Sequence, residues 1–308
     1  MNIVEIASGN WVAKINLNCG GNCICLKNKK HDLSVLREPN QVEKPDNPYL
    51  YGMPILFPPN RIQDGRFVFE GREYIFPINE RKTNCHLHGF LHQAEFEILE
   101  QGASFIRCQY ESDELYRFFP HKFRVEILYS LSEQGLLQEV TIHNLSATNM
   151  PVSLGFHSTF NLPFAQDSSA DDILLLAQVG DEMERDPSRH LPTGNTLPID
   201  EISAALNSGE FHPSKNQISR HYQSAGEGRI ELHDTQNNIK IIYSNDTQYK
   251  WRLLFNGGNR NFICLEPQTS MVNCQNSDLE HAYTGFDHIA PYTCKKYISR
   301  IDVQFLWQ

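Results

Sequence analysis

The sequence predicts an all-β protein, a large β-sandwich of mostly antiparallel strands with a few short helices. Apolar and polar residues alternate in many short runs, which is the period of a half-buried strand. Turn-forming residues separate these runs at short intervals, as they do in sandwiches built from hairpins. A helical period is scarce in the 308 residues, so helices are expected mainly in connections.

The first predicted pair of strands lies in 66–76, RFVFEGREYIF. Two β-rich runs flank Glu70 and Gly71 there and indicate a hairpin. The segment 84–88 is also expected to be extended. A further strand is expected over 104–110, SFIRCQY.

The clearest alternation is in 123–131, FRVEILYSL. Every second residue is apolar, starting at Phe123, and polar residues such as Arg124 and Glu126 lie between them. This pattern predicts a strand with one buried face and one solvated face. The sequence EQG at 133–135 then predicts a turn, and LLQEVTIHN predicts the returning strand.

The C-terminal half continues the pattern and adds one helix. Pro198 near the start and Gly209 as a stop indicate a short loop helix in PIDEISAALNSG. GRIELHD at 228–234 and NIKIIYSND at 238–246 predict another pair of strands, and FICLEP predicts a further strand. Neither a linker nor a fixed-period repeat divides the sequence, so a single domain over residues 1–308 is expected.

The charge balance argues against nucleic-acid and membrane partners. The chain has 27 Lys and Arg against 37 Asp and Glu, a formal charge of −10, and KNKKH at 27–31 is its closest approach to a basic run. Such a surface repels phosphate backbones and anionic lipid. The N-terminal residues lack a signal-peptide pattern, and no stretch of about 18 apolar residues indicates a membrane span. A cytoplasmic location is therefore expected, with the eight cysteines as buried thiols.

Three histidines, His86, His88 and His92, fall close together in NCHLHGFLH. In an extended chain His86 and His88 point to the same side, and Gly89 lets the backbone turn or lets a ligand approach closely. The spacing H-x-H-x3-H suits a transition metal, because imidazole is the commonest metal ligand. Ordinary structural histidines, or one catalytic histidine among them, also fit this spacing. Three interpretations therefore stay open at this point.

Three further residues are candidates for chemistry. His157, in LGFHSTF, is either a satisfied core histidine or a functional one. Glu266 interrupts an apolar strand in FICLEPQTS. It is either half of a buried ion pair or functional, because burying a free carboxylate is costly. Arg61, in PPNRIQDGR, either pairs with Asp64 in its own loop or contacts a ligand.

Four segments, taken in order, resemble the aldose 1-epimerase (galactose mutarotase) family. They are PPNRIQDGRFVFEGREYIFPIN, LHG, GFHSTFNL and CLEPQTS. GGNCICLKNKKHDLSVLREP and YGMPILFP also resemble that family's opening strands. The resemblance extends from about residue 10 to about residue 305.

This resemblance implies a β-supersandwich that binds a small-molecule sugar in an open cleft across one sheet, with neither metal nor cofactor. It implies that Glu266 is the general base for the C1 hydroxyl group and that His157 is the general acid for the ring oxygen. His88 would hydrogen-bond the sugar near its ring oxygen or C1 oxygen, and Arg61 would bind sugar hydroxyl groups. The further residues expected to contact the sugar are Asn60 and Phe160.

These residue types fit the opening of a cyclic hemiacetal, which needs one proton removed and another supplied. A carboxylate with a pKa of about 4.3 is ionised at neutral pH, and a histidine with a pKa of about 6.5 can hold or release a proton. Rotation about the C1–C2 bond and reclosure by the reverse proton transfers then give the other anomer. The expected function is therefore that of an aldose 1-epimerase.

Three departures from the family leave the identity of the sugar open. Phe90 stands where galactose-type members commonly carry a second glycine, and Thr159 stands where they commonly carry tyrosine. The segment 217–223, QISRHYQ, lies where the family's sugar-binding aspartate is expected and contains no acid. Galactose is therefore not assumed, and the oligomeric state is not predicted.

Two alternative functions use the same scaffold. A non-catalytic carbohydrate-binding protein is favoured if Glu266 and His157 lie too far apart to act on one sugar ring. A hexose-6-phosphate 1-epimerase needs a basic cluster at the rim of the cleft. The candidates for that cluster are Arg66, Arg72, Arg81 and Lys82.

Overall fold

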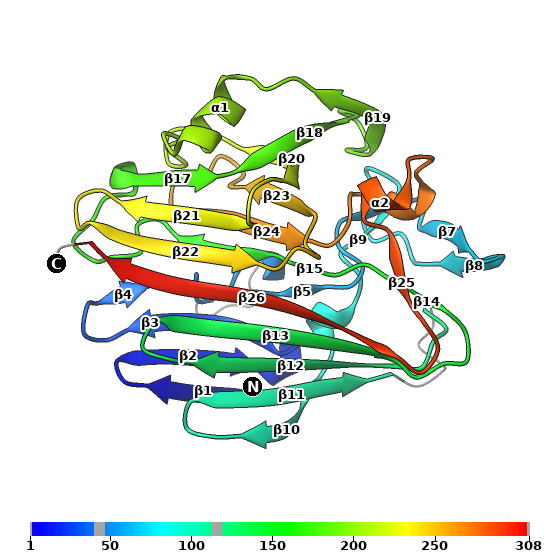
Figure 1. Cartoon of the computed structure of the whole chain (residues 1–308), viewed down its shortest axis with the longest axis horizontal. Coiled ribbons are helices and arrows are strands. Elements are labelled where there is room, and N and C mark those ends of the chain that lie inside the picture. The colour runs from blue at the N-terminus through cyan, green and yellow to red at the C-terminus, as the bar shows by residue number, and fades with distance from the viewer. Residues whose placement is uncertain (1, 40–46, 113–118, 307–308) are drawn as a thin grey trace.

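Two eight-stranded antiparallel sheets form the body of the protein (Figure 1). The structure is a computed structural model and describes residues 2–39, 47–112 and 119–306. The all-β prediction is confirmed, because strands dominate this part of the chain and only two short α-helices occur in it.

The long strands that run side by side across the front of Figure 1 belong to the first sheet. In spatial order this sheet contains β10 (Glu97–Gln101), β11 (Phe105–Glu111), β12 (Phe123–Leu131), β13 (Gly135–Asn144), β26 (Cys294–Phe305), β22 (Ile239–Asn245), β21 (Arg229–Asp234) and β17 (Ile173–Ala177).

The second sheet carries the residues of the candidate site. In spatial order it contains β19 (Pro192–Leu197), β18 (Val179–Arg185), β20 (Ser219–Ser224), β23 (Trp251–Phe255), β24 (Phe262–Gln268), β15 (Gly155–Phe156) and β5 (Ile55–Leu56), and β16 (Ser158–Asn161) also pairs with β24.

Smaller elements flank the two large sheets. The four-stranded sheet contains β1 (Ile3–Ser8), β2 (Trp11–Asn16), β3 (Asn22–Asn28) and β4 (Leu33–Ser34). The two-stranded pairs are β6 (Arg61–Gln63) with β9 (Cys85–Leu87), β7 (Arg66–Phe69) with β8 (Arg72–Ile75), and β14 (Met150–Val152) with β25 (Asp287–Ile289). The helices are α1 (Glu201–Ser208) and α2 (His281–Thr284), and the 3-10 turns are η1 (Leu17–Cys19), η2 (Pro48–Leu50), η3 (Leu91–Gln93), η4 (Ala170–Asp172) and η5 (Cys274–Asn276).

The strongest strand predictions are confirmed. β12 covers the whole of 123–131, and its residues alternate between buried and half-buried. The hairpin in 66–76 is present as β7 and β8, joined through Glu70 and Gly71, which both have positive φ angles. Two such residues in a row are what a tight hairpin turn requires. The other strands that the sequence predicts are present in the structure as β11, β13, β21, β22 and β24.

Two predicted boundaries differ from the structure. The helix begins only after Asp200, because this side chain caps it by accepting a hydrogen bond from the N–H group of Ser203, so Pro198 lies outside it. The expected extended run at 84–88 is a strand only over Cys85–Leu87. The residues on either side of this strand have left-handed backbones, so the alternation of side chains ends at Leu87.

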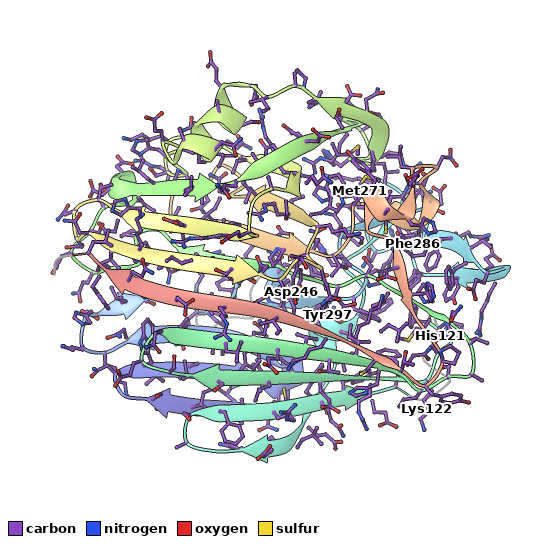
Figure 2. All side chains as sticks on the ribbon, viewed as in Figure 1. His121, Lys122, Asp246, Met271, Phe286 and Tyr297 are labelled. Carbon is purple, nitrogen blue, oxygen red and sulfur yellow. The ribbon has the colours of Figure 1, made fainter. Side chains whose placement is uncertain are left out.

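The main core lies between the two large sheets. Tyr243 of β22 contacts β16 of the second sheet, where its hydroxyl group lies 3.0 Å from that of Ser158. A smaller buried cluster beside α2 contains Met271 and Phe286 (Figure 2). In the described residues no helix is long and apolar enough to cross a membrane. Six of the eight cysteines are buried, as expected, and Cys19 and Cys294 are exposed.

Candidate active site

The register between β16 and β24 brings His157 and Glu266 together. Ser158 pairs with Leu265. Because side chains alternate along both strands, neighbouring residues point to opposite faces of the sheet. Ser158 and Leu265 face the core between the sheets, whereas His157 and Glu266 lie on the opposite face. Thr159 confirms this arrangement, because its hydroxyl group contacts the thiol of Cys264 on that same face, 3.3 Å away.

The imidazole of His157 contacts the carboxyl group of Glu266 directly. Nε2 of His157 lies 3.2 Å from Oε1 of Glu266, and 8% and 0% of the two side chains are exposed. Burial raises the pKa of Glu266 well above its ordinary value of 4.5 and lowers the pKa of His157 from 6.5 to about 4. The two shifts run in opposite directions, so they favour a protonated carboxyl group beside a neutral imidazole.

The charged surroundings of Glu266 partly oppose the effect of burial. Its Oε2 accepts a hydrogen bond of 3.3 Å from the amide of Gln268, and the positive charges of Arg185 and Arg61 lower its pKa. Arg185 extends from β18, and its guanidinium group donates a hydrogen bond to the backbone carbonyl of Ser219. Glu266 is therefore not half of a Lys or Arg ion pair among the described residues, and its basic partner in direct contact is His157.

His88 is held in one orientation by the backbone of Asn60. The N–H group of Asn60 donates to Nδ1 of His88 over 3.2 Å, and the N–H group of His88 donates to the carbonyl of Asn60 over 3.0 Å. Burial lowers the pKa of His88 well below 6.5, so its ring is neutral at neutral pH. Because Nδ1 accepts, the single ring proton is on Nε2.

The turn at Gly89 explains how His88 reaches this position. His88 has a φ angle of +66° and Gly89 one of +63°. A Cβ atom on Gly89 would lie 1.8 Å from the carbonyl oxygen of Phe57. The glycine thus admits the close approach of another backbone segment, not of a ligand as one interpretation of the sequence had it. The ring of His88 lies edge-on to that of His157, with centroids 5.6 Å apart.

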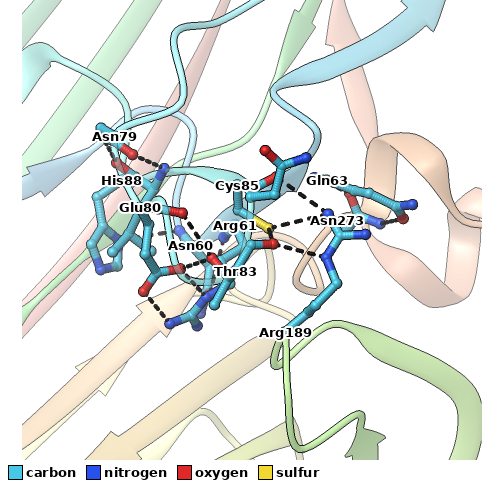
Figure 3. A network of polar contacts seen from close by, with 12 residues as sticks. Asn60, Arg61, Gln63, Asn79, Glu80, Thr83, Cys85, His88, Arg189 and Asn273 are labelled. Carbon is cyan, nitrogen blue, oxygen red and sulfur yellow. Dashed lines mark hydrogen bonds and ion pairs between the residues drawn. The ribbon is translucent and has the colours of Figure 1, made fainter.

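Arg61 is paired with Glu80 in a polar network (Figure 3). Its Nε and one terminal nitrogen donate to the two carboxylate oxygens over 2.6 and 2.7 Å. Burial alone would raise the pKa of Glu80, but the hydrogen bonds from Arg61 and Thr83 lower it below 4.5. The interpretation that Arg61 pairs with Asp64 is wrong, because Asp64 pairs with Arg189, 2.7 Å away.

The three neighbouring histidines have different partners. Nδ1 of His86 lies 2.8 Å from the carbonyl of Pro77, and its ring packs against those of Phe76 and Phe90, with centroids 4.9 Å from each. His88 faces His157, and His92 contacts Tyr49. Among the described residues no group of three or more His, Cys, Asp or Glu side chains is arranged to hold a metal ion.

Phe160 lies apart from these residues. It is two residues after Ser158 in β16, so it faces the core, where it is fully buried against Tyr243 with ring centroids 5.5 Å apart. The expected contact between Phe160 and a sugar does not fit this position. Asn60, by contrast, lies within the cluster and is 2% exposed.

The segment 217–223 contributes a buried histidine to the face that carries Glu266. His221 pairs with Leu253 across the strands, and Leu253 pairs with Glu266. Neither ring nitrogen of His221 has a hydrogen-bond partner in the described part of the chain. Burial lowers the pKa of His221 to about 3.

Sequence reasoning missed Tyr49, Glu80 and Arg185. The ring of Tyr49 packs on His88 and His157, Glu80 binds Arg61, and Arg185 influences Glu266. None of them lies in a local pattern that marks chemistry.

The chain is similar to proteins of one family. A sequence model described as "Aldose 1-epimerase" matches residues 3–282. Galactose mutarotase of Rattus norvegicus is 28% identical over 198 residues, which cover 62% of this chain and 52% of that protein. An uncharacterised Escherichia coli protein, YihR, is 30% identical over 105 residues, covering 33% of this chain and 34% of that protein. The chain thus spans about a third to a half of the length of these curated relatives.

Solved structures extend the similarity over the whole fold. A galactose mutarotase-like protein from Clostridium acetobutylicum has a TM-score of 0.93 and 29% sequence identity, and the alignment covers 99% of this chain and 95% of that one. Galactose 1-epimerase from Lactobacillus acidophilus has a TM-score of 0.72, with coverage of 96% and 92%. At 15% identity, this second likeness shows the fold alone.

Proposed function

Because this chain belongs to the aldose 1-epimerase family, we propose that it interconverts the α and β anomers of an aldose. The reaction is a ring opening and reclosure carried out by an acid and a base. The contact between Nε2 of His157 and Oε1 of Glu266, 3.2 Å long, carries this proposal. A non-catalytic sugar-binding protein needs no acid and base close enough to act on one ring.

Each ring opening moves two protons. The carboxylate of Glu266 takes the proton of the C1 hydroxyl group, and protonated His157 gives its proton to the ring oxygen while the bond between C1 and that oxygen breaks. The open-chain aldehyde then lies beside a protonated Glu266 and a neutral His157. Rotation about the C1–C2 bond turns the other face of the carbonyl to the ring-closing hydroxyl group. The reverse transfers return both protons and close the ring.

The protonation states of the two residues suit a reversible reaction. Burial stabilises a protonated Glu266 and a neutral His157, the pair that the open-chain intermediate needs. The opposing shifts reverse the ordinary order of the two pKa values, because that of His157 falls to about 4 while that of Glu266 rises above 4.5. Ring opening therefore moves the pair toward the protonation states that burial favours, and ring closure uses the same two groups in reverse.

Other residues hold the sugar in place. The Nε2–H group of His88 is free to donate to the ring oxygen or the C1 oxygen, since Asn60 occupies Nδ1. Arg61 is fixed by Glu80 and keeps donors for sugar hydroxyl groups. No covalent nucleophile takes part in this scheme.

Polarimetry of freshly dissolved sugars tests the proposal. The protein should accelerate the approach to anomeric equilibrium, and Glu266→Gln should lower that rate by roughly 10²- to 10⁴-fold, the usual range for a general base. An unchanged rate in this variant removes Glu266 from the mechanism. The panel should contain glucose, galactose, other aldoses and hexose 6-phosphates. Of the expected rim residues for a phosphate, Arg66 is 61% exposed and pairs with Glu73 on a hairpin.

A further inference from the structure

Tyr49 lies against both histidines of the proposed acid–base site. It belongs to η2, and its ring centroid lies 4.6 Å from that of His88 and 6.0 Å from that of His157. The ring planes of Tyr49 and His157 differ by 29°, so these two rings are stacked. One aromatic ring therefore restricts the movement of both imidazoles.

The hydroxyl group of Tyr49 is tied to His92, the third histidine of NCHLHGFLH. Its oxygen lies 3.1 Å from Nε2 of His92, and the amide of Gln93 lies 2.9 Å from the same nitrogen. Burial raises the pKa of Tyr49 to about 12 and lowers the pKa of His92 to about 4. At neutral pH the phenol therefore keeps its proton and can donate it to a neutral imidazole.

The backbone of Tyr49 is fixed as well. Its N–H group donates to the side chain of Asn47 over 3.0 Å, and its carbonyl accepts a hydrogen bond of 3.4 Å from the hydroxyl group of Thr159. Thr159 belongs to β16, two residues after His157. Tyr49 is thus joined to η3 through its side chain and to the strand of the proposed acid through its backbone.

We propose that Tyr49 is a positioning residue that holds His88 and His157 in the geometry for proton transfer, with His92 as its anchor. The proposal rests on the epimerase reaction, in which acid and hydrogen-bond donor must meet oxygens of one sugar ring. A displacement of about 1 Å in such an arrangement can cost roughly 10²-fold in rate.

Two single variants and their combination test the anchor. Tyr49→Phe keeps the ring and removes the hydroxyl group, and His92→Leu removes the acceptor. Each should lower kcat by about 3- to 10-fold, the effect of one lost hydrogen bond, with little change in KM. The double variant should be no slower than the slower single variant, because both changes break the same hydrogen bond.

A second pair in the chain provides a matched control. Tyr74 and His121 form the same kind of hydrogen bond, with the hydroxyl group 2.7 Å from Nε2, and neither contacts the proposed acid and base. Tyr74→Phe therefore removes an equivalent bond from the same fold. It should leave kcat unchanged while lowering the free energy of unfolding about as much as Tyr49→Phe does.

The imidazole ¹H–¹⁵N signals of His88 and His157 give a measurement that does not depend on activity. Both signals should shift or broaden in Tyr49→Phe and in His92→Leu, and not in Tyr74→Phe. Signals and kcat identical to the wild type, or additive losses in the double variant, would overturn the proposal. If the wild-type protein accelerates no anomerisation, the epimerase function fails, and the imidazole signals still decide whether Tyr49 positions the two rings.

Discussion

Nε2 of His157 and Oε1 of Glu266 lie 3.2 Å apart on the face of one sheet that points away from the core between the two large sheets, and neither residue has a Lys or Arg partner in direct contact among the described residues. A buried carboxyl group without such a partner is costly for the fold. The same isolation makes it a stronger base, because water no longer stabilises its charge. Stability and the proposed chemistry therefore make opposite demands on Glu266.

The first prediction concerns stability. Glu266→Gln should raise the free energy of unfolding at neutral pH by about 0.5–2 kcal/mol, while it abolishes most of the proposed activity. The reason is that folding raises the pKa of Glu266 above its ordinary value of 4.5, so the folded wild type loses stability as the pH rises above that value. Denaturant unfolding at several pH values measures the gain, which should disappear as the pH falls to about 4.5.

Glu182→Gln is the matched control for that measurement. Burial also raises the pKa of Glu182, but this acid pairs with Arg220 over 3.0 Å. Its replacement leaves Arg220 without one partner and should not stabilise the protein, nor should it slow anomerisation. An equal gain in both variants would mean that the removal of any acid from this sheet explains the effect.

The second prediction concerns the pH dependence of the rate. The positive charge of Arg185 lowers the pKa of Glu266, so Arg185→Gln should raise it. At a given pH a smaller fraction of Glu266 is then ionised, and the acidic limb of the kcat profile should move to higher pH. Arg220→Gln, one strand away and engaged with Glu182 and Asp200, should leave the profile in place. A profile that moves equally in both variants contradicts a specific role of Arg185.

The third prediction concerns substrate binding. Glu80→Gln removes the charge that fixes the guanidinium group of Arg61, so KM for the sugar should rise by about 10-fold, while kcat changes less. Glu73→Gln breaks the exposed pair with Arg66, which lies on the hairpin, and should change neither constant. A lower kcat with an unaltered KM would instead assign Glu80 to the proton transfers.

The sequence predicted the parts of this arrangement that depend on local pattern. Alternation placed the strands, and the ordered motifs around Arg61, His88, His157 and Glu266 pointed to one family. The partners of these residues could not be predicted in the same way. Glu80 reaches Arg61 only because β6 pairs with β9 and the intervening chain folds back beside them.

The positions of two residues show the same limit. The motif alone suggested that Phe160 contacts the sugar, but the strand register turns it to the core. His88 was expected to share a side with His86, but the positive φ angle of His88 breaks the alternation. Both outcomes depend on backbone geometry that residue types do not encode within a short window.

The candidate site is divided between two separate pairs of strands, and this division has a consequence for the rate of folding. Arg61 and His88 come from the small β6–β9 unit, whereas His157 and Glu266 come from the neighbourhood of β16 and β24 in the large sheet. Neither unit contains both the acid–base pair and the residues that hold the sugar. During refolding, catalysis should therefore return only once these two units have docked, later than the β-sheet signal in circular dichroism. Regained turnover would then report the final assembly of the molecule and not the formation of its sheets.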